Sequence, residues 1–129
     1  MRGWRKPNAP QSIGRMANAA DLQRYTGIVY RSRVIRSFAD ETTRDLFGNV
    51  NSKAARRIPN TAWKAGQRKL KQLDLVAKLD DLKIPPGNDL HALKGDQAGR
   101  HAIKVNDQYR ITFRWEGQDA YDVCCEDYH

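Results

Sequence analysis

The last third of the chain alternates apolar and polar positions with the two-residue period of β-strands. Three such runs follow one another, separated by turn-forming residues: His101–Val105, Tyr109–Trp115 and Tyr121–Asp127. In the middle run the aromatic and aliphatic side chains fall on one face, while Arg110, Thr112 and Arg114 fall on the other. The pattern predicts an antiparallel meander with one buried face.

The middle third has the longer period of amphipathic helices. A short strand over residues 34–38 is expected to lead into a short helix over residues 39–47, which Gly48 closes. Pro59 opens a second helix. Its apolar stripe comprises Trp63, Leu70, Leu73, Val76 and Ala77. Residues 84–88 contain two prolines and predict an extended connector. Helices followed by a meander describe an α+β domain, with a small antiparallel sheet and two N-terminal helices packed on one side.

A change of composition at Val34 divides the chain into a basic leader, residues 1–33, and a folded domain, residues 34–129. The leader holds seven of the 23 Lys and Arg but only one of the 15 acidic residues, so the remaining 96 residues carry only +2 of the net charge of +8. The leader lacks sustained periodicity and is expected to be poorly ordered. It also lacks an apolar run long enough for a signal peptide or a membrane span, which predicts no membrane association.

The only two cysteines, Cys124 and Cys125, are adjacent in a predicted strand. A strand points neighbouring side chains to opposite faces, so a structural disulfide is not expected. A reducing, cytoplasmic location fits this use of cysteine.

The polar residues of the predicted sheet and its approach are the candidates for chemistry. The sequence has no glycine-rich phosphate loop, no spaced Cys/His set for zinc and no Gly-x-Ser-x-Gly elbow, so neither a metal nor a cofactor is expected. The candidates are His91, Lys94, Arg100, His101, Gln108, Arg110, Asp127, Tyr128 and His129. Metal-free cleavage of RNA needs a base, cations for the phosphate charge and an acid for the leaving oxygen. This set contains all three kinds of group, as many small domains do.

Several blocks of sequence carry a more specific signal through their order and spacing. They are Ile35–Phe38, Pro85–Asn88, Leu90–Asp96, Asn106–Phe113 and the closing Asp127-Tyr128-His129. With these blocks, residues 34–129 resemble the HigB-type toxins of the RelE/ParE superfamily. The resemblance implies a small curved antiparallel sheet with two N-terminal helices against it. It also implies a type II toxin that cleaves messenger RNA in the ribosomal A site, by attack of the 2′-hydroxyl on its own phosphate.

The resemblance assigns the end of the chain a catalytic role. His129 corresponds to the catalytic histidine of the family, beside Asp127 and Tyr128, and an imidazole with a pKa of roughly 6.5 suits proton transfer at neutral pH. Simpler roles remain open, since Asp127 could only cap or pair with a lysine and Tyr128 could be a half-buried sheet residue. Which residue acts as base and which as acid is open as well.

The other implied site residues precede the last strand. His91 and Lys94 fall on positions that line the family's site, with Lys94 a candidate for the phosphate charge and His91 open to a structural reading. Arg110 could clamp the phosphate with two hydrogen bonds. Gln108, where some relatives carry Asn, and Arg100 are candidates for RNA contact. His101 is expected to be a strand residue.

The expected partners also follow from the resemblance. They are a HigA-like helix-turn-helix antitoxin, the ribosome and messenger RNA, with operator DNA bound only through the antitoxin. Two other functions stay open: a ParE-like toxin that binds DNA gyrase and cuts nothing, or a degenerate toxin that only binds its antitoxin.

The family usually begins at the residue before Ile35, which here is Val34, and a GTG start codon read internally would be written as valine. Residues 1–33 are therefore expected to be upstream reading frame joined to the protein by a misplaced start. The alternative is a genuine extension whose basic residues add RNA affinity.

Overall fold

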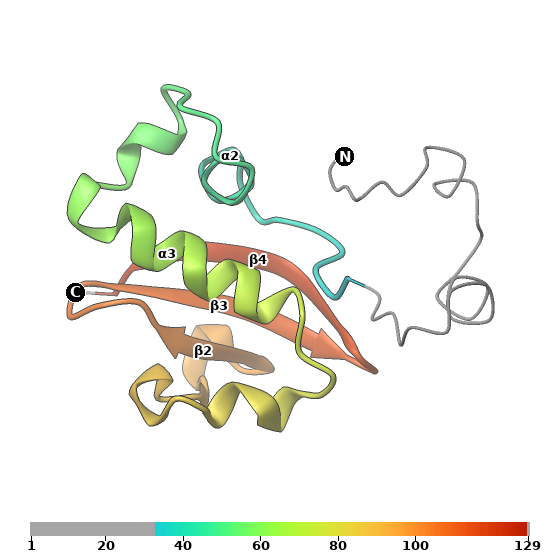
Figure 1. Ribbon diagram of the computed structural model, residues 1–129. Helices are drawn as coiled ribbons and strands as arrows, with labels where there is room; N and C mark the ends of the chain where they lie inside the picture. Colours follow the sequence, from blue (N-terminus) through green and yellow to red (C-terminus); the bar gives the residue numbers. More distant parts are fainter. Residues whose placement is uncertain (1–32, 129) are drawn as a thin grey trace, which may run out of the picture. The chain divides into compact units, whose positions relative to one another are not determined.

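The structure, a computed structural model, describes residues 33–128, which belong to one compact unit; residues 1–32 and His129 lie outside the described residues. The helices and strands of the described part are α2 (Glu41–Phe47), α3 (Asn60–Leu73), β1 (His91–Ala92), β2 (Arg100–Lys104), β3 (Tyr109–Glu116) and β4 (Asp119–Asp127). The strands form one open antiparallel sheet in the order β1-β2-β3-β4, and both helices pack on one side of it (Figure 1). This arrangement confirms the predicted α+β fold.

The segment before α2 runs beside β4. Ile35 and Phe38 form isolated parallel bridges with Ala120 and Val123, in place of the regular strand expected over residues 34–38. Helix α2 then begins at the N-cap Asp40, whose carboxylate accepts the backbone N–H of residue 43 at 2.8 Å. This cap satisfies one of the free N–H groups of the first turn. The helix therefore begins at Glu41, two residues after the predicted start at residue 39, and ends at Phe47 as predicted.

Helix α3 lies across the sheet and contacts α2 through a glycine. A Cβ atom on Gly66 would lie 3.2 Å from a methyl group of Leu46, so the absent side chain lets the two helices approach closely. The helix ends at Leu73, one turn earlier than the apolar stripe predicted. Val76 is still buried, from the loop that follows, but Ala77 is exposed, and its place on the helical stripe was wrong.

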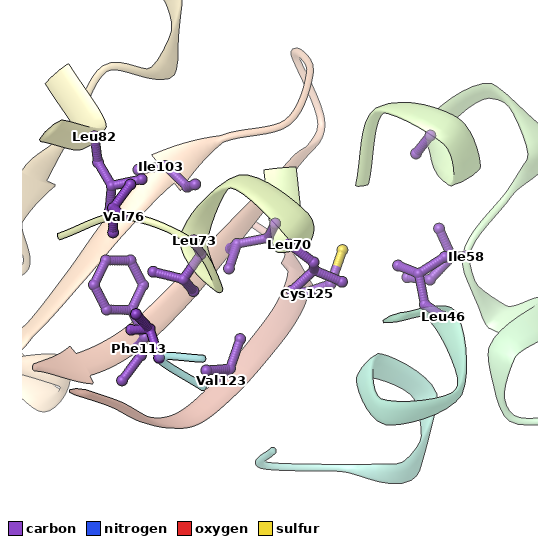
Figure 2. Close-up of a cluster of buried hydrophobic side chains, with 14 residues drawn as sticks. Leu46, Ile58, Leu70, Leu73, Val76, Leu82, Ile103, Phe113, Val123 and Cys125 are labelled. Atoms are coloured by element: carbon purple, nitrogen blue, oxygen red, sulfur yellow. The ribbon is translucent and has the colours of Figure 1, made fainter. Parts of the chain in front are cut away.

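The core lies between the helices and the sheet (Figure 2). Its largest fully buried side chains are Phe113, Leu46, Leu70, Leu73, Leu82, Ile103, Ile111 and Val123. On β3 the buried face was predicted correctly, because Ile111 and Phe113 have no exposed surface and Tyr109 and Trp115 pack against the core. Thr112 is also fully buried, although it was placed on the polar face. The sheet is therefore partly covered on both faces.

The proline-containing connector is a turn and not an extended segment. The peptide bond between Ile84 and Pro85 is cis, and residues 86–88 form a 3₁₀ turn that ends in the fully buried Asn88. The Asn88 amide donates to the side chain of Gln72 and to the carbonyl of Leu82, both at 3.1 Å, so the turn is tied to α3. This attachment fixes the chain just before β1, a strand too short to be predicted from sequence.

The two cysteines are free thiols, as expected. Cys125 packs in the core, and the Cys124 thiol donates to a carboxylate oxygen of Asp40 at 3.4 Å on the other side of β4. Burial raises the pKa of each thiol to about 12, so both stay protonated and unreactive near neutral pH. Within residues 33–128, neither helix combines the length and the apolarity that crossing a membrane requires.

Candidate active site

The strand registers place three of the candidate residues, His91, Arg100 and Arg110, on the outer face of the sheet, which is turned away from α3. Arg110 of β3 lies opposite Lys104 of β2 and Glu126 of β4. His91 of β1 lies opposite Ala102, which belongs to the same face. The outer face thus brings together side chains from all four strands at the end of the sheet where β4 finishes.

A pocket of about 240 Å³ opens there. Its lining consists of Asp89, His91, Ile103, Lys104, Arg110 and Tyr128. Three of these residues, His91, Arg110 and Tyr128, are predicted site residues. The pocket combines two permanent cations, an imidazole and a phenol, which is a set that can hold a phosphate and move protons.

The ring of His91 has a defined tautomer. Its Nδ1 lies 2.7 Å from the backbone carbonyl oxygen of Asp89, and a carbonyl only accepts hydrogen bonds. The proton of the neutral ring is therefore assigned to Nδ1, which leaves Nε2 with an unshared electron pair. Asp89 adopts the left-handed conformation, with φ of 50°, that brings its carbonyl to this position.

Arg110 is held on two sides. Its Nε and one terminal nitrogen donate to the same carboxylate oxygen of Glu126, at 3.1 and 2.8 Å. Its guanidinium carbon lies 5.5 Å from the centre of the Tyr128 ring, within the range of a cation–π contact. The Arg110 side chain is only 21 % exposed. Its guanidinium is therefore held against the outer face of the sheet.

The last described residues are tied to the turn between β2 and β3. The backbone N–H of Tyr128 donates to the carbonyl of Gln108 at 3.1 Å, and the Gln108 amide donates to the carboxylate of Asp127 at 2.9 Å. The Tyr128 hydroxyl donates to the carbonyl of Asn106 at 3.1 Å. These bonds hold the chain up to the residue before His129, which itself lies outside the described residues.

Three of the remaining predicted residues, Lys94, Arg100 and His101, do not line the pocket. Lys94 is exposed and precedes a short 3₁₀ turn after β1. Arg100 lies on the outer face of β2, where one terminal nitrogen donates to the hydroxyl of Thr112 at 3.0 Å and to the carbonyl of Asp122 at 2.7 Å. His101 lies on β2 and stacks on Phe113, as expected of a strand residue.

Asp127 lies beside Tyr109, on the opposite side of the sheet from Arg110. Burial, and after it the charge of Asp127, raises the pKa of Tyr109, so this phenol stays protonated. Among residues 33–128, no cluster of three or more His, Cys, Asp or Glu side chains could hold a metal ion.

Comparison with known proteins identifies the family. Residues 36–129 match the model of the HigB-like toxins, described as RelE-like toxins of the type II toxin–antitoxin system HigB. The chain belongs to this family. The match includes every candidate site residue, His129 among them.

Individual relatives of this HigB-like toxin are also named as HigB toxins. Toxin HigB-1 of Vibrio cholerae is 43% identical over 65 residues, which are 50% of this chain and 68% of that protein. Endoribonuclease HigB of Proteus vulgaris is 50% identical over 40 residues, which are 31% of this chain and 44% of that protein. Among solved structures, a YoeB/ParE toxin from Agrobacterium tumefaciens aligns with a TM-score of 0.44 and 17% identity, covering 74% of this chain and 99% of that one. Membership of a type II toxin–antitoxin family implies an antitoxin partner.

Sequence reasoning missed three residues of this HigB-like toxin that lie at the pocket. Lys104 and Asp89 line it, and Glu126 binds Arg110. Lys104 and Glu126 could have been found from the two-residue period, because each shares the face of Arg110 once the strand registers are known. Asp89 contributes through its backbone carbonyl, for which the sequence carries no signal.

Proposed function

We propose that this toxin is a metal-independent endoribonuclease that cleaves messenger RNA bound in the ribosomal A site and so stops translation. The observation that supports it best is the pocket where His91, Lys104, Arg110 and Tyr128 meet at the end of the sheet. A relative named Endoribonuclease HigB adds support. The cytoplasm, where ribosomes work, is the proposed location.

The proposed reaction is a transfer within the RNA. The 2′-oxygen attacks the adjacent phosphorus and loses its proton to a base, while the bond from phosphorus to the 5′-oxygen breaks and that oxygen takes a proton from an acid. The products are a 2′,3′-cyclic phosphate and a free 5′-hydroxyl. The transition state carries extra negative charge on the phosphate, which the guanidinium of Arg110 and the ammonium of Lys104 would stabilise.

We assign the base and the acid to the two histidines. His91 lines the pocket, and the Nε2 of its neutral ring has an electron pair that is suited to accept the 2′-hydroxyl proton. His129 is proposed as the acid, following its position in the family. Lys94 and Gln108 would contact flanking nucleotides, and Asp127 and Tyr128 would hold the end of the chain in place.

The low net charge of the domain favours a mechanism in which the ribosome presents the RNA. Residues 34–129 carry a net charge of only +2, and affinity for free RNA depends mainly on neutralised phosphates. Capture of free message by this domain would therefore be weak, and a ribosome that presents the message removes the need for it. The antitoxin is proposed to be of the HigA-like helix-turn-helix type and to carry the complex to operator DNA.

Purified toxin is expected to cut a defined message when programmed ribosomes are present and to leave the same message intact without them. Mapping of the 5′-ends by primer extension, with a 3′-end assay for cyclic phosphate, measures both the cut and its chemistry. Cutting of free message at the same rate would refute the ribosome dependence. Growth arrest with intact message would refute the nuclease and move the search to gyrase supercoiling.

A substrate in which sulfur replaces the leaving 5′-oxygen distinguishes the proposed base, His91, from the proposed acid, His129. A thiolate leaves without an acid, so His129→Ala, expected to be about 100-fold slower on the normal message, should recover most of that loss on the sulfur substrate. His91→Ala should stay slow on both substrates, because the 2′-hydroxyl still needs its base. Recovery by His91→Ala in place of His129→Ala would exchange the two assignments.

A further inference from the structure

Glu126 lies at the centre of a hydrogen-bond network on the outer face. One of its oxygens, Oε2, accepts the two bonds from Arg110 and a third from the Gln97 amide at 3.2 Å. Its other oxygen lies 3.4 Å from the hydroxyl of Thr112. That hydroxyl in turn accepts from Arg100. The carboxylate is therefore fixed from three directions, and only 27 % of its side chain is exposed.

The network uses one edge of the Arg110 guanidinium and leaves another available. Glu126 takes the edge formed by Nε and one terminal nitrogen. A guanidinium has five N–H donors, so the edge between its two terminal nitrogens keeps its fork geometry for a phosphate. The ring of Tyr128 covers a face of the same group. Edge and face contacts together restrict both the position and the rotation of the guanidinium.

A carboxylate beside a phosphate-binding arginine has an electrostatic cost, since it repels the phosphate. Glu126 offsets this cost by restricting Arg110, because a long arginine side chain loses rotamer entropy when it is fixed. An arginine that is fixed before RNA arrives does not lose that freedom during the reaction. Positioning of this kind raises the rate of the bound substrate more than it raises affinity.

We infer that Glu126 is a positioning residue, which orients Arg110 so that its free edge meets the scissile phosphate in the transition state. This inference rests on the proposed nuclease function and adds a residue to it that the family resemblance did not assign. Glu126 does not touch the RNA, and its whole effect on cleavage passes through Arg110. That dependence is the property to test.

Glu126→Gln and Glu126→Ala should each lower the rate of cleavage on saturating programmed ribosomes by about tenfold to a hundredfold, with less than a twofold change in the toxin concentration that gives half the maximal rate. In an Arg110→Ala background, Glu126→Gln should change the rate by less than about twofold. Asp119→Asn is the matched control, because Asp119 lies on the same strand, pairs with Arg36 at 3.2 Å and is similarly exposed, at 31 %. It should retain the original rate.

Equal loss from Glu126→Gln with and without Arg110 would show an independent role and overturn the inference. Unchanged cleavage by Glu126→Gln would do the same.

A second measurement does not depend on cleavage. In nitrogen-15 spectra of the arginine side chains, the Nε–H of Arg110 should exchange slowly with water and resonate apart from exposed arginines, and Glu126→Gln should move it to the exposed position. An exposed-type signal in the original protein would overturn the inference directly. A protein that shows the restrained signal but cuts no message would instead remove the proposed function, and would leave the pair with a structural role alone.

Discussion

Replacing Arg110 with alanine is expected to lower the rate of message cleavage by about 10²–10³-fold, the usual loss when one fixed donor to a developing charge is removed. Arg110 is the more buried of the two pocket cations, 21 % exposed against 41 % for Lys104, and it contacts Glu126 and Tyr128. The pentacoordinate phosphate carries more negative charge than the ground state, so the loss should fall on the maximal rate. Single-turnover cleavage on programmed ribosomes measures it.

Arg110→Lys separates charge from geometry. Lysine keeps the charge but presents no fork, so about a tenfold to thirtyfold loss is expected instead of the larger one. Arg36→Ala serves as the control, because Arg36 is also an arginine paired with a carboxylate of β4 but lies at the other end of that strand. Full cleavage by Arg110→Ala, with an unchanged melting temperature, would place the phosphate elsewhere on the domain.

The sheet could be predicted from sequence because its strands repeat a pattern several times. In β3 the alternation of Ile111 and Phe113 with Arg110 and Arg114 spans a whole strand, and burial against α3 favours that register. The strand β1 contains only His91 and Ala92, too few residues for a periodic signal, and it exists because it pairs with β2. Short elements of this kind depend on tertiary contacts that a sequence does not display.

The end of α3 shows the limit of a periodicity argument. Val76 continues the apolar stripe and is buried, yet the helix ends at Leu73, and the following residue, Asp74, bonds the start of the domain. The turn at Asn88 is a similar case, because its buried amide contacts α3 and its own connector. In both places a buried polar side chain bonds a segment distant in the sequence, and such a bond leaves no periodic signal.

Part of the site could be predicted from sequence, through the family resemblance and not through periodicity. His91, Arg110 and Tyr128 were named through the family resemblance, and the pocket brings these three together. Glu126 was overlooked although it lies next to Asp127, because alternation along β4 sends neighbouring side chains to opposite faces and only the register with β3 shows which one meets Arg110. The leader and the role of His129 fall outside the described residues and stay predictions.

Asp74→Ala is expected to lower the free energy of unfolding by about 3 kcal/mol, a large share of the stability of a small domain. Asp74 is 3 % exposed and follows the last residue of α3. One of its carboxylate oxygens accepts the backbone N–H groups of Val34 and Ile35, at 3.0 and 2.9 Å, and the other pairs with Arg33 at 2.8 Å. Alanine would remove these bonds and leave a buried N–H group with fewer partners.

Asp74→Asn distinguishes the backbone bonds from the ion pair. Asparagine keeps an oxygen for the two N–H groups and loses only the pair with Arg33, whose side chain is 65 % exposed, so a loss below about 1 kcal/mol is expected. Urea unfolding followed by circular dichroism measures both variants, and the slope of the transition checks that unfolding stays cooperative. Equal losses from the two substitutions would mean that Asp74 stabilises the domain through the ion pair with Arg33, and not through its bonds to the backbone N–H groups of Val34 and Ile35. A larger loss for alanine would show that the Asp74 oxygen bonded to Val34 and Ile35 joins the end of α3 to the segment beside β4. Since Ile35 bridges Ala120 of β4, the same oxygen would connect the helix to the strand that carries Glu126.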